Sequence, residues 1–134
     1  MFYVTYGKPK SISNKLMDKM VLFAGEFLEI DPTIEIDFED GDFNDDVAGY
    51  ADYEDKQITV YINPELPKED LITTFFHEMV HVKQYVKGEL VSGEGWTPSR
   101  WKGAYIKANY FDSPWEQEAY EYEKVMMDVF KQTY

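Results

Sequence analysis

Residues 67–88 read PKEDLITTFFHEMVHVKQYVKG, and this stretch determines how the rest of the chain is interpreted. Pro67, with two acidic residues among the next three positions, is typical of a helix N-terminus, and Gly88 is typical of a helix end. The apolar residues between them form a wide surface rather than a narrow stripe. The pattern therefore predicts a largely buried helix that runs from Pro67 to about Lys87.

Both histidines of the chain lie in this stretch, in the pattern H-E-x-x-H formed by His77, Glu78 and His81. Residues four apart share one helix face, about 6 Å apart along the axis, so both imidazoles can bind one zinc ion. Glu78 is rotated by about 100° from His77, which places it to reach a water on the metal rather than the metal itself. The alternative is a pair of histidines without a metal, because the pattern also arises by chance.

A catalytic zinc usually has three protein ligands and one open position. The chain has no cysteine and no third histidine, so the third ligand is expected to be a carboxylate. A C-terminal helix, predicted from Pro114 to about Lys131, offers four candidates: Glu116, Glu118, Glu121 and Glu123.

The position of each glutamate along this helix favours Glu118. Residues 113–116 (Ser-Pro-Trp-Glu) resemble a capping box, which would give Glu116 a local structural role. Glu118 falls within the apolar stripe of the helix, where a lone carboxylate is costly unless it has a partner such as zinc. The residues of this stripe are Trp115, Ala119, Tyr122, Val125, Met126 and Val129. Glu121 lies on the flank of that stripe, and Glu123 lies well outside it. We therefore predict Glu118 as the third ligand; the alternative is a carboxylate that reaches solvent or bonds a tyrosine.

The remaining apolar patterns predict an α+β fold in one domain over residues 1–134. The expected elements are a helix from Ser11 or Ser13 to about Leu28 and strands at residues 2–6, 33–38, 48–53 and 57–62. These strands would form a mixed sheet of three to four strands. Residues 89–112 are expected to be irregular, with a small hairpin.

Composition excludes several classes of protein. Without cysteine the chain forms no disulfide and uses no thiol chemistry. A net charge of −13 argues against a nucleic-acid partner and is compatible with a basic peptide, although acidic surfaces more often serve solubility.

No signal peptide and no membrane span is visible, so a cytoplasmic location is expected. Residues 39–46 begin like a calcium loop but lack its glycine and closing glutamate, which favours a solvated loop.

These residues resemble the gluzincin metallopeptidases, whose H-E-x-x-H helix is followed by a later helix that carries a glutamate ligand and often a small residue after it. The motif residues and Glu118-Ala119 match that pattern. With Trp101-Lys102-Gly103, Tyr110 and residues 114–119, the chain also resembles small metallopeptidases of bacteriophages and bacteria, over roughly residues 57–120. The resemblance implies a small zincin-like domain in which residues 57–62 form an edge strand that pairs with an extended peptide substrate.

The chain departs from these families at two positions. Thermolysin-like members stabilise the oxyanion with a further histidine, and this chain has none. Arg100, Tyr105 and Tyr110 are the candidates to replace it, although such tyrosines more often serve as core or surface aromatics. Larger relatives also place a supporting aspartate four residues after the glutamate ligand, where this chain has Tyr122.

The leading hypothesis is zinc-dependent hydrolysis of a peptide or protein substrate, in the cytoplasm of a bacterial host if a phage encodes the chain. His77, His81 and Glu118 would bind Zn²⁺, and Glu78 would be the general base. One alternative is a zinc-binding protein without catalysis that acts as a binding or structural module. Another is a protease for protein–DNA crosslinks, against which the acidic charge argues.

Overall fold

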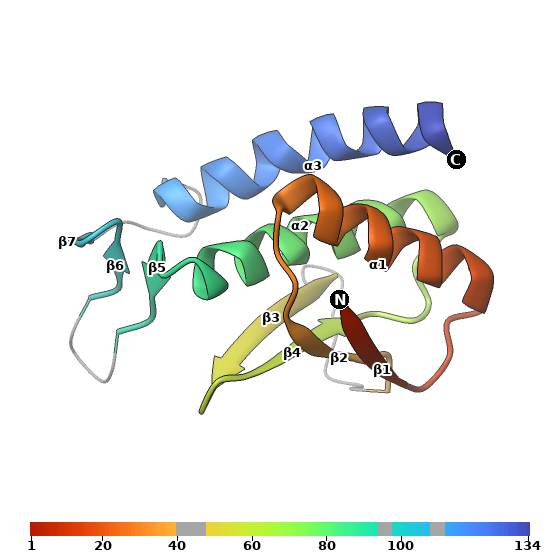
Figure 1. Ribbon diagram of the computed structural model, residues 1–134, viewed down its shortest axis with the longest axis horizontal. Coiled ribbons are helices and arrows are strands. Elements are labelled where there is room, and N and C mark those ends of the chain that lie inside the picture. The colour runs from red at the N-terminus through yellow and green to blue at the C-terminus, as the bar shows by residue number, and fades with distance from the viewer. Residues whose placement is uncertain (40–47, 94–97, 108–111) are drawn as a thin grey trace.

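The structure is a computed structural model of the 134-residue chain, and it describes residues 1–39, 48–93, 98–107 and 112–134 (Figure 1). Most of the acidic loop and Tyr110 lie outside these ranges. The elements, in chain order, are β1 (Phe2–Tyr6), α1 (Asn14–Leu28), β2 (Thr33–Asp37), β3 (Gly49–Glu54), β4 (Gln57–Ile62), α2 (Lys68–Val86), β5 (Leu90–Val91), β6 (Arg100–Trp101), β7 (Ala104–Tyr105) and α3 (Pro114–Thr133).

The fold is α+β, as predicted. Four strands form a mixed sheet in the order β1-β2-β4-β3, in which β1 and β4 pair parallel with β2 and β3 pairs antiparallel with β4. The tight turn between β3 and β4 contains Asp55 and Lys56, which both have positive φ (52° and 65°), as two-residue hairpin turns require. The three short strands β5, β6 and β7 form a second, antiparallel sheet, which includes the small hairpin expected from the sequence.

The position of β4 in the sheet corrects one expectation. Residues 57–62 do form a strand, but β4 lies between β2 and β3, and β3 is the edge strand. Every second residue of β4 is buried against the helices: Ile58, Val60 and Ile62. This alternation identifies a strand with one buried face, but it carries no information about which strands lie beside it.

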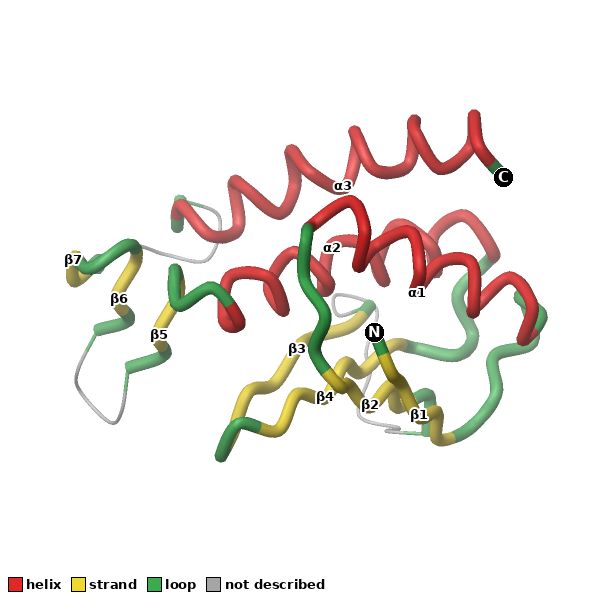
Figure 2. The backbone as a smooth tube through the Cα atoms, viewed as in Figure 1, coloured by secondary structure: helices red, strands yellow, loops and turns green. Residues whose placement is uncertain are grey.

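Helix α2 occupies the centre of the molecule. It contacts α1, α3, β3 and β4, and it passes between the sheet and α3 (Figure 2). Phe75, Phe76, Met79 and Val80 are fully buried. A helix that packs against elements on several sides needs apolar residues around most of its circumference, which explains the wide apolar surface seen in the sequence.

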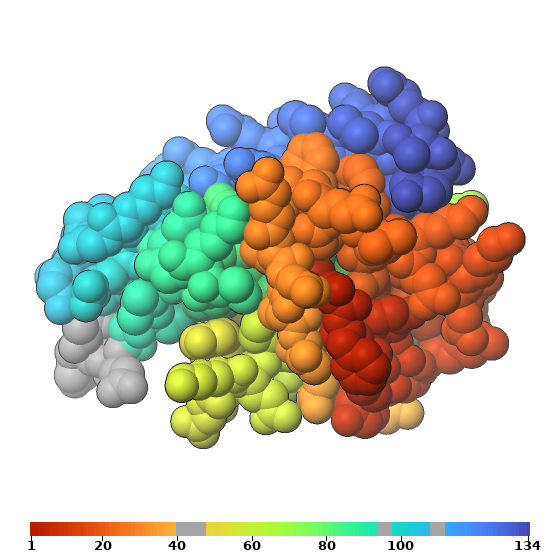
Figure 3. All heavy atoms as spheres, in the orientation of Figure 1, coloured from red at the N-terminus to blue at the C-terminus, as the bar shows by residue number. Residues whose placement is uncertain are grey.

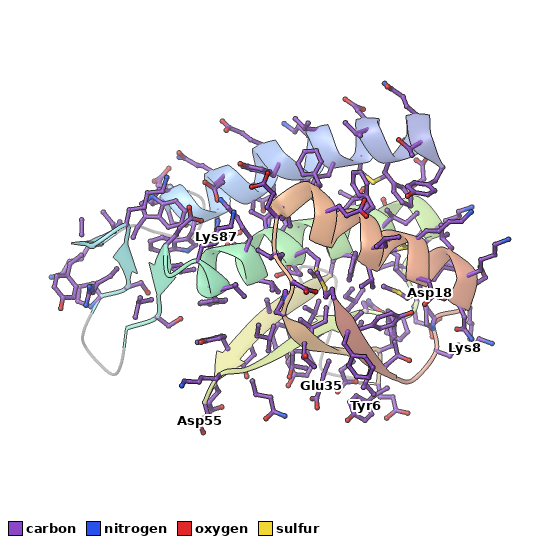
Figure 4. The ribbon with its side chains drawn as sticks, viewed as in Figure 1. Tyr6, Lys8, Asp18, Glu35, Asp55 and Lys87 are labelled. Atoms are coloured by element: carbon purple, nitrogen blue, oxygen red, sulfur yellow. The ribbon has the colours of Figure 1, made fainter. Side chains whose placement is uncertain are left out.

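The sheet has one buried and one outward face. Ile34 and Ile36 of β2 point into the core, whereas Tyr6 and Glu35 point away from the helices (Figure 4). The second edge strand, β1, lies at the surface beside α1 (Figure 3) and exposes Phe2. Among the described residues, no helix is long and apolar enough to cross a membrane.

Candidate metal centre

Helix α2 presents the three residues of the motif at a buried site, as predicted. His77 and Glu78 are each 6% exposed and His81 is 7% exposed. The imidazole rings of the two histidines lie 5.1 Å apart, centroid to centroid. The four-residue spacing has therefore brought both rings to one face of the helix.

The third side chain at this site is Glu116 of α3. Its Oε1 lies 3.0 Å from Nε2 of His77 and 3.1 Å from Nε2 of His81. One ligand atom from each of these three buried residues lies within 4.8 Å of the others, so together they could hold a metal ion. The H-E-x-x-H motif and a glutamate from the later helix thus form one site.

Glu118, the ligand predicted from the sequence, lies elsewhere, and Glu116 replaces it as the candidate ligand. Oε1 of Glu118 lies 2.7 Å from Nζ of Lys83 and accepts a hydrogen bond from the side-chain amide of Gln84 at 3.2 Å. A carboxylate near the buried face of α3 does have a partner, as the sequence argument required, but that partner is a lysine. The Ser113 side chain makes no capping hydrogen bond, so this half of the expected capping box does not form.

The error arose from the orientation of α3. The predicted apolar stripe included Val125 and Val129, which are 51% and 37% exposed. The residues that face the core follow a different line along the helix, with spacings of three and four: Glu116, Ala119, Glu123, Met126 and Phe130. Two of these five are glutamates that contact histidine, so a search for apolar residues alone places the buried face incorrectly.

Each histidine has a second partner on its other ring nitrogen. Nδ1 of His77 lies 3.1 Å from Oε2 of Glu123, and Nδ1 of His81 lies 2.8 Å from Oε1 of Gln84. Such partners orient an imidazole and fix which nitrogen carries the proton. Neither residue was predicted from the sequence as the partner of a histidine. Their spacings do contain a signal, because Glu123 follows Glu116 by two helical turns and Gln84 follows His81 by about one.

These contacts determine where the imidazole lone pairs point. A carboxylate oxygen and an amide carbonyl oxygen only accept hydrogen bonds, so each Nδ1 donates, and Nε2 of a neutral histidine carries the lone pair. Both lone pairs then face Oε1 of Glu116, itself an acceptor. Oε1 of Glu116 thus lies 3.0–3.1 Å from two other acceptors, the Nε2 atoms of the histidines. Acceptors this close together need a cation between them, either protons or a metal ion. Two imidazole nitrogens and one carboxylate oxygen form a ligand set typical of catalytic zinc.

The charges of the metal-free site agree with this geometry. Burial lowers the pKa of His77, but hydrogen bonds to Glu116 and Glu123 outweigh it and raise this pKa to about 10. Burial raises the pKa of Glu116, but hydrogen bonds from His77 and His81 outweigh it and lower this pKa to about 2. Protons therefore reside on the histidines in the metal-free protein, at the positions where a metal would bind.

Glu78 is in a different environment from Glu116. Burial raises the pKa of Glu78 to about 7, and the nearby positive charges of His81 and His77 offset only part of this effect. A carboxyl group that titrates near neutral pH can both accept and release a proton, which is the property required of a general base that later acts as an acid.

The site opens into a cleft of about 680 Å³. One wall of the cleft is formed by the start of β3 and the residue before it (Ala48, Gly49, Tyr50 and Ala51). Another wall is formed by Trp115 and Tyr120 of α3. Gly49 allows the close approach of β3 to α2: a Cβ at this position would lie 2.6 Å from the Tyr61 carbonyl oxygen and 2.9 Å from Cγ2 of Thr74.

Two of the three residues expected to stabilise an oxyanion, Arg100 and Tyr105, are not among the described residues that line the cleft. Arg100 and Tyr105 lie in β6 and β7, where the guanidinium stacks over the tyrosine ring at 5.7 Å. Tyr110 lies outside the described residues. Among the described residues, the tyrosines that line the cleft are Tyr50, Tyr85 and Tyr120, and the ring of Tyr120 packs against His77 at 4.7 Å, centroid to centroid.

Comparison of the chain with protein-family models, with curated proteins and with solved structures finds no match. The function proposed below therefore rests on the geometry of the site.

Proposed function

We propose that the protein is a zinc-dependent metallopeptidase, with His77, His81 and Glu116 as metal ligands and Glu78 as the general base. One observation carries the proposal. Two histidine nitrogens and a carboxylate oxygen converge beside a separate buried carboxyl group, at a cleft bordered by a sheet edge. A structural metal site needs neither the extra carboxyl group nor the cleft.

Each residue of the site would have a distinct role in the reaction. When bound, zinc would supply a Lewis acid that polarises the substrate carbonyl group and lowers the pKa of a water molecule. His77, His81 and Glu116 would hold the ion, and Glu123 and Gln84 would orient the two imidazoles. Glu78, a buried carboxyl group that lines the cleft beside the ligands, would take a proton from the attacking water and deliver it to the leaving amine.

The edge strand supports a peptide as the substrate. Within the part of the chain that the structure describes, β3 pairs only with β4, and its first residues line the cleft. The outer edge of β3 can therefore offer backbone donors and acceptors to an extended chain. This is the substrate-pairing role that the sequence had assigned to residues 57–62, moved to the neighbouring strand.

The charge of the cleft indicates which peptides suit it. Its described lining residues include Glu78, Glu116 and Glu123 but no lysine or arginine. A peptide C-terminus would find no lysine or arginine among them, whereas a basic peptide side chain would be attracted by these glutamates and by the protein's net charge of −13. We therefore propose neutral or basic peptide segments as substrates, and no direct nucleic-acid partner.

The proposal is tested with zinc-loaded protein and a library of unstructured peptides, basic ones included. Glu78→Gln is expected to retain zinc and to lose at least about 100-fold in turnover, because general-base catalysis contributes about 10²–10⁴. Glu121→Gln, a charge-matched change at an exposed position of α3, should leave turnover unchanged. Zinc bound at one equivalent without cleavage of any peptide would instead support the non-catalytic zinc-binding module.

A further inference from the structure

A chain of polar contacts leads from the metal site into the interior between α2 and α3. Its members are Lys83, Gln84 and Glu118, and we refer to them as the relay. Lys83 and Gln84 are buried, which is unusual for such side chains. Nζ of Lys83 lies 2.7 Å from Glu118 and 2.9 Å from Glu89, and it also lies 5.1 Å from the ring centre of Tyr122.

Gln84 is the member of the relay that contacts the metal site. Its amide nitrogen donates to the Trp115 carbonyl oxygen at 3.0 Å and to Oε1 of Glu118 at 3.2 Å. Both partners are pure acceptors, so the NH₂ group must face them and the carbonyl oxygen must face His81. The distance from that oxygen to Nδ1 of His81 is 2.8 Å.

The opposite orientation of the amide would be incompatible with a metal at His81. An NH₂ group facing Nδ1 would require a lone pair on that nitrogen, and the proton of a neutral imidazole would then move to Nε2. Nε2 is the atom that faces Glu116 and His77 in the candidate metal site. A protonated Nε2 cannot bind a metal.

We propose that the relay is a positioning device, in which Lys83 and Glu118 orient the Gln84 amide so that His81 presents a free Nε2 to the metal. This inference rests on the metal site of the proposed function but not on peptide hydrolysis. The lysine holds the Glu118 carboxylate in place, and Glu118 acts with the Trp115 carbonyl oxygen to hold the NH₂ group. The two histidines are thus supported differently, His77 by a carboxylate and His81 by an oriented amide.

Zinc affinity, measured by competition with a chromophoric chelator, tests the role of Gln84. Gln84→Met has a similar size but no acceptor, and we expect it to weaken zinc binding about 10–100-fold, as loss of the partner of a metal-binding histidine typically does. Gln84→Glu retains an acceptor for Nδ1 but loses the NH₂ group that donates to Glu118 and to the Trp115 carbonyl oxygen, so it is expected to recover only part of that loss. The visible spectrum of the cobalt-substituted protein gives a second readout, which should change in Gln84→Met and resemble that of the parent in Gln84→Glu.

A double variant tests the outer part of the relay without leaving either member of the Lys83–Glu118 pair as a lone charge. Glu89, the second partner of Lys83, loses its lysine but has a side chain that is 22% exposed. Lys83→Met with Glu118→Leu removes both charges, a replacement that folded proteins often tolerate. We expect the double variant to fold and to bind zinc several-fold more weakly. Lys131→Met with Glu69→Leu is the matched control, because this pair also joins α3 to α2, at 3.2 Å, but is largely exposed. The control should bind zinc as the parent does.

The outcomes separate this inference from the proposed function. A parent protein that binds no zinc overturns both. A parent that binds zinc, together with Gln84→Met and the double variant within about twofold of its affinity, overturns the relay alone. If the double variant and its control lost zinc affinity equally, the relay would also be overturned. The loss would then follow from removing any ion pair between α2 and α3, not from this pair in particular. If Gln84→Met fails to fold, the double variant and its control decide the question.

Discussion

Glu116 and His77 lie 39 residues apart in the chain, yet Oε1 of the glutamate is 3.0 Å from Nε2 of the histidine. One residue belongs to α3 and the other to α2, so the site forms only when these helices pack together. A metal bound here would connect the C-terminal helix to the centre of the fold. Metal binding and folding would therefore be coupled, as they are in proteins whose metal ligands come from separate segments.

This coupling predicts that zinc stabilises the protein. A ligand that binds only the folded state adds about 2.7 kcal/mol to the free energy of unfolding at a free concentration 100 times its Kd. Thermal unfolding should therefore shift to higher temperature with zinc and return to the original temperature with EDTA. Glu116→Ala should abolish the shift, and Glu121→Gln should preserve it. An equal shift in both variants would mean that zinc binds at some other site.

The metal-free protein should lose stability as the pH rises. The pKa of His77 is raised to about 10 in the folded state, so its protonation stabilises the fold fully below about 6.5, its ordinary value. That stabilisation is lost as the pH rises from about 6.5 towards 10. The raised pKa of Glu78, about 7, has an effect of the same sign between its ordinary value of 4.5 and 7.

Thermal unfolding in EDTA at about pH 6, 7.5 and 9 measures this effect. The unfolding temperature should fall across the series without metal and should fall less with zinc, because a metal takes the place of the protons. A metal-free protein that becomes more stable over this range would contradict the arrangement of acceptors described for the site.

Glu123 is expected to support the metal through His77. Removal of the partner of a metal-binding histidine typically reduces metal affinity by about 10–100-fold. Glu123→Ala should therefore weaken zinc binding by about this factor, while Glu123→Gln, which keeps an oxygen acceptor for Nδ1, should weaken it less. Zinc titrations of both variants measure the difference. Identical affinities for Glu123→Ala and the parent would show that the 3.1 Å contact plays no part in metal binding.

Gly49 is predicted to be required for the position of the edge strand. A methyl group there would meet the Tyr61 carbonyl oxygen at 2.6 Å, and a backbone oxygen cannot rotate away as a side chain can. Gly49→Ala should cost about 1–3 kcal/mol of stability, the usual effect of overpacking, and should reduce peptide cleavage. Zinc affinity should be unchanged, because the ligands lie on α2 and α3. Chemical denaturation and a zinc titration of the same preparation separate these effects.

The sequence predicted the elements that depend on local patterns. Helices α1 and α3 and strands β2 and β4 lie at the expected positions in the chain, and the H-E-x-x-H spacing placed His77 and His81 on one buried face. Such features depend on residues that are close together in the chain, so they can be predicted from a single sequence.

The sequence did not predict what depends on packing between distant segments. The rotation of α3 decides that Glu116 faces the histidines while Glu118 faces Lys83. A search for apolar residues treats Glu116 and Glu123 as surface residues, although both contact His77. Likewise, the pattern of β4 does not reveal that β3 covers its edge. Both errors concern neighbours that only the folded chain brings together.

The most direct test of the metal centre is the zinc content of the purified, zinc-loaded protein and of two variants of it, Glu116→Ala and Glu118→Gln. The structure predicts about one zinc per chain in the parent and in Glu118→Gln, and little or none in Glu116→Ala. Loss of zinc from Glu118→Gln with retention in Glu116→Ala would contradict the ligand assignment, and a parent without zinc would contradict the metal centre itself.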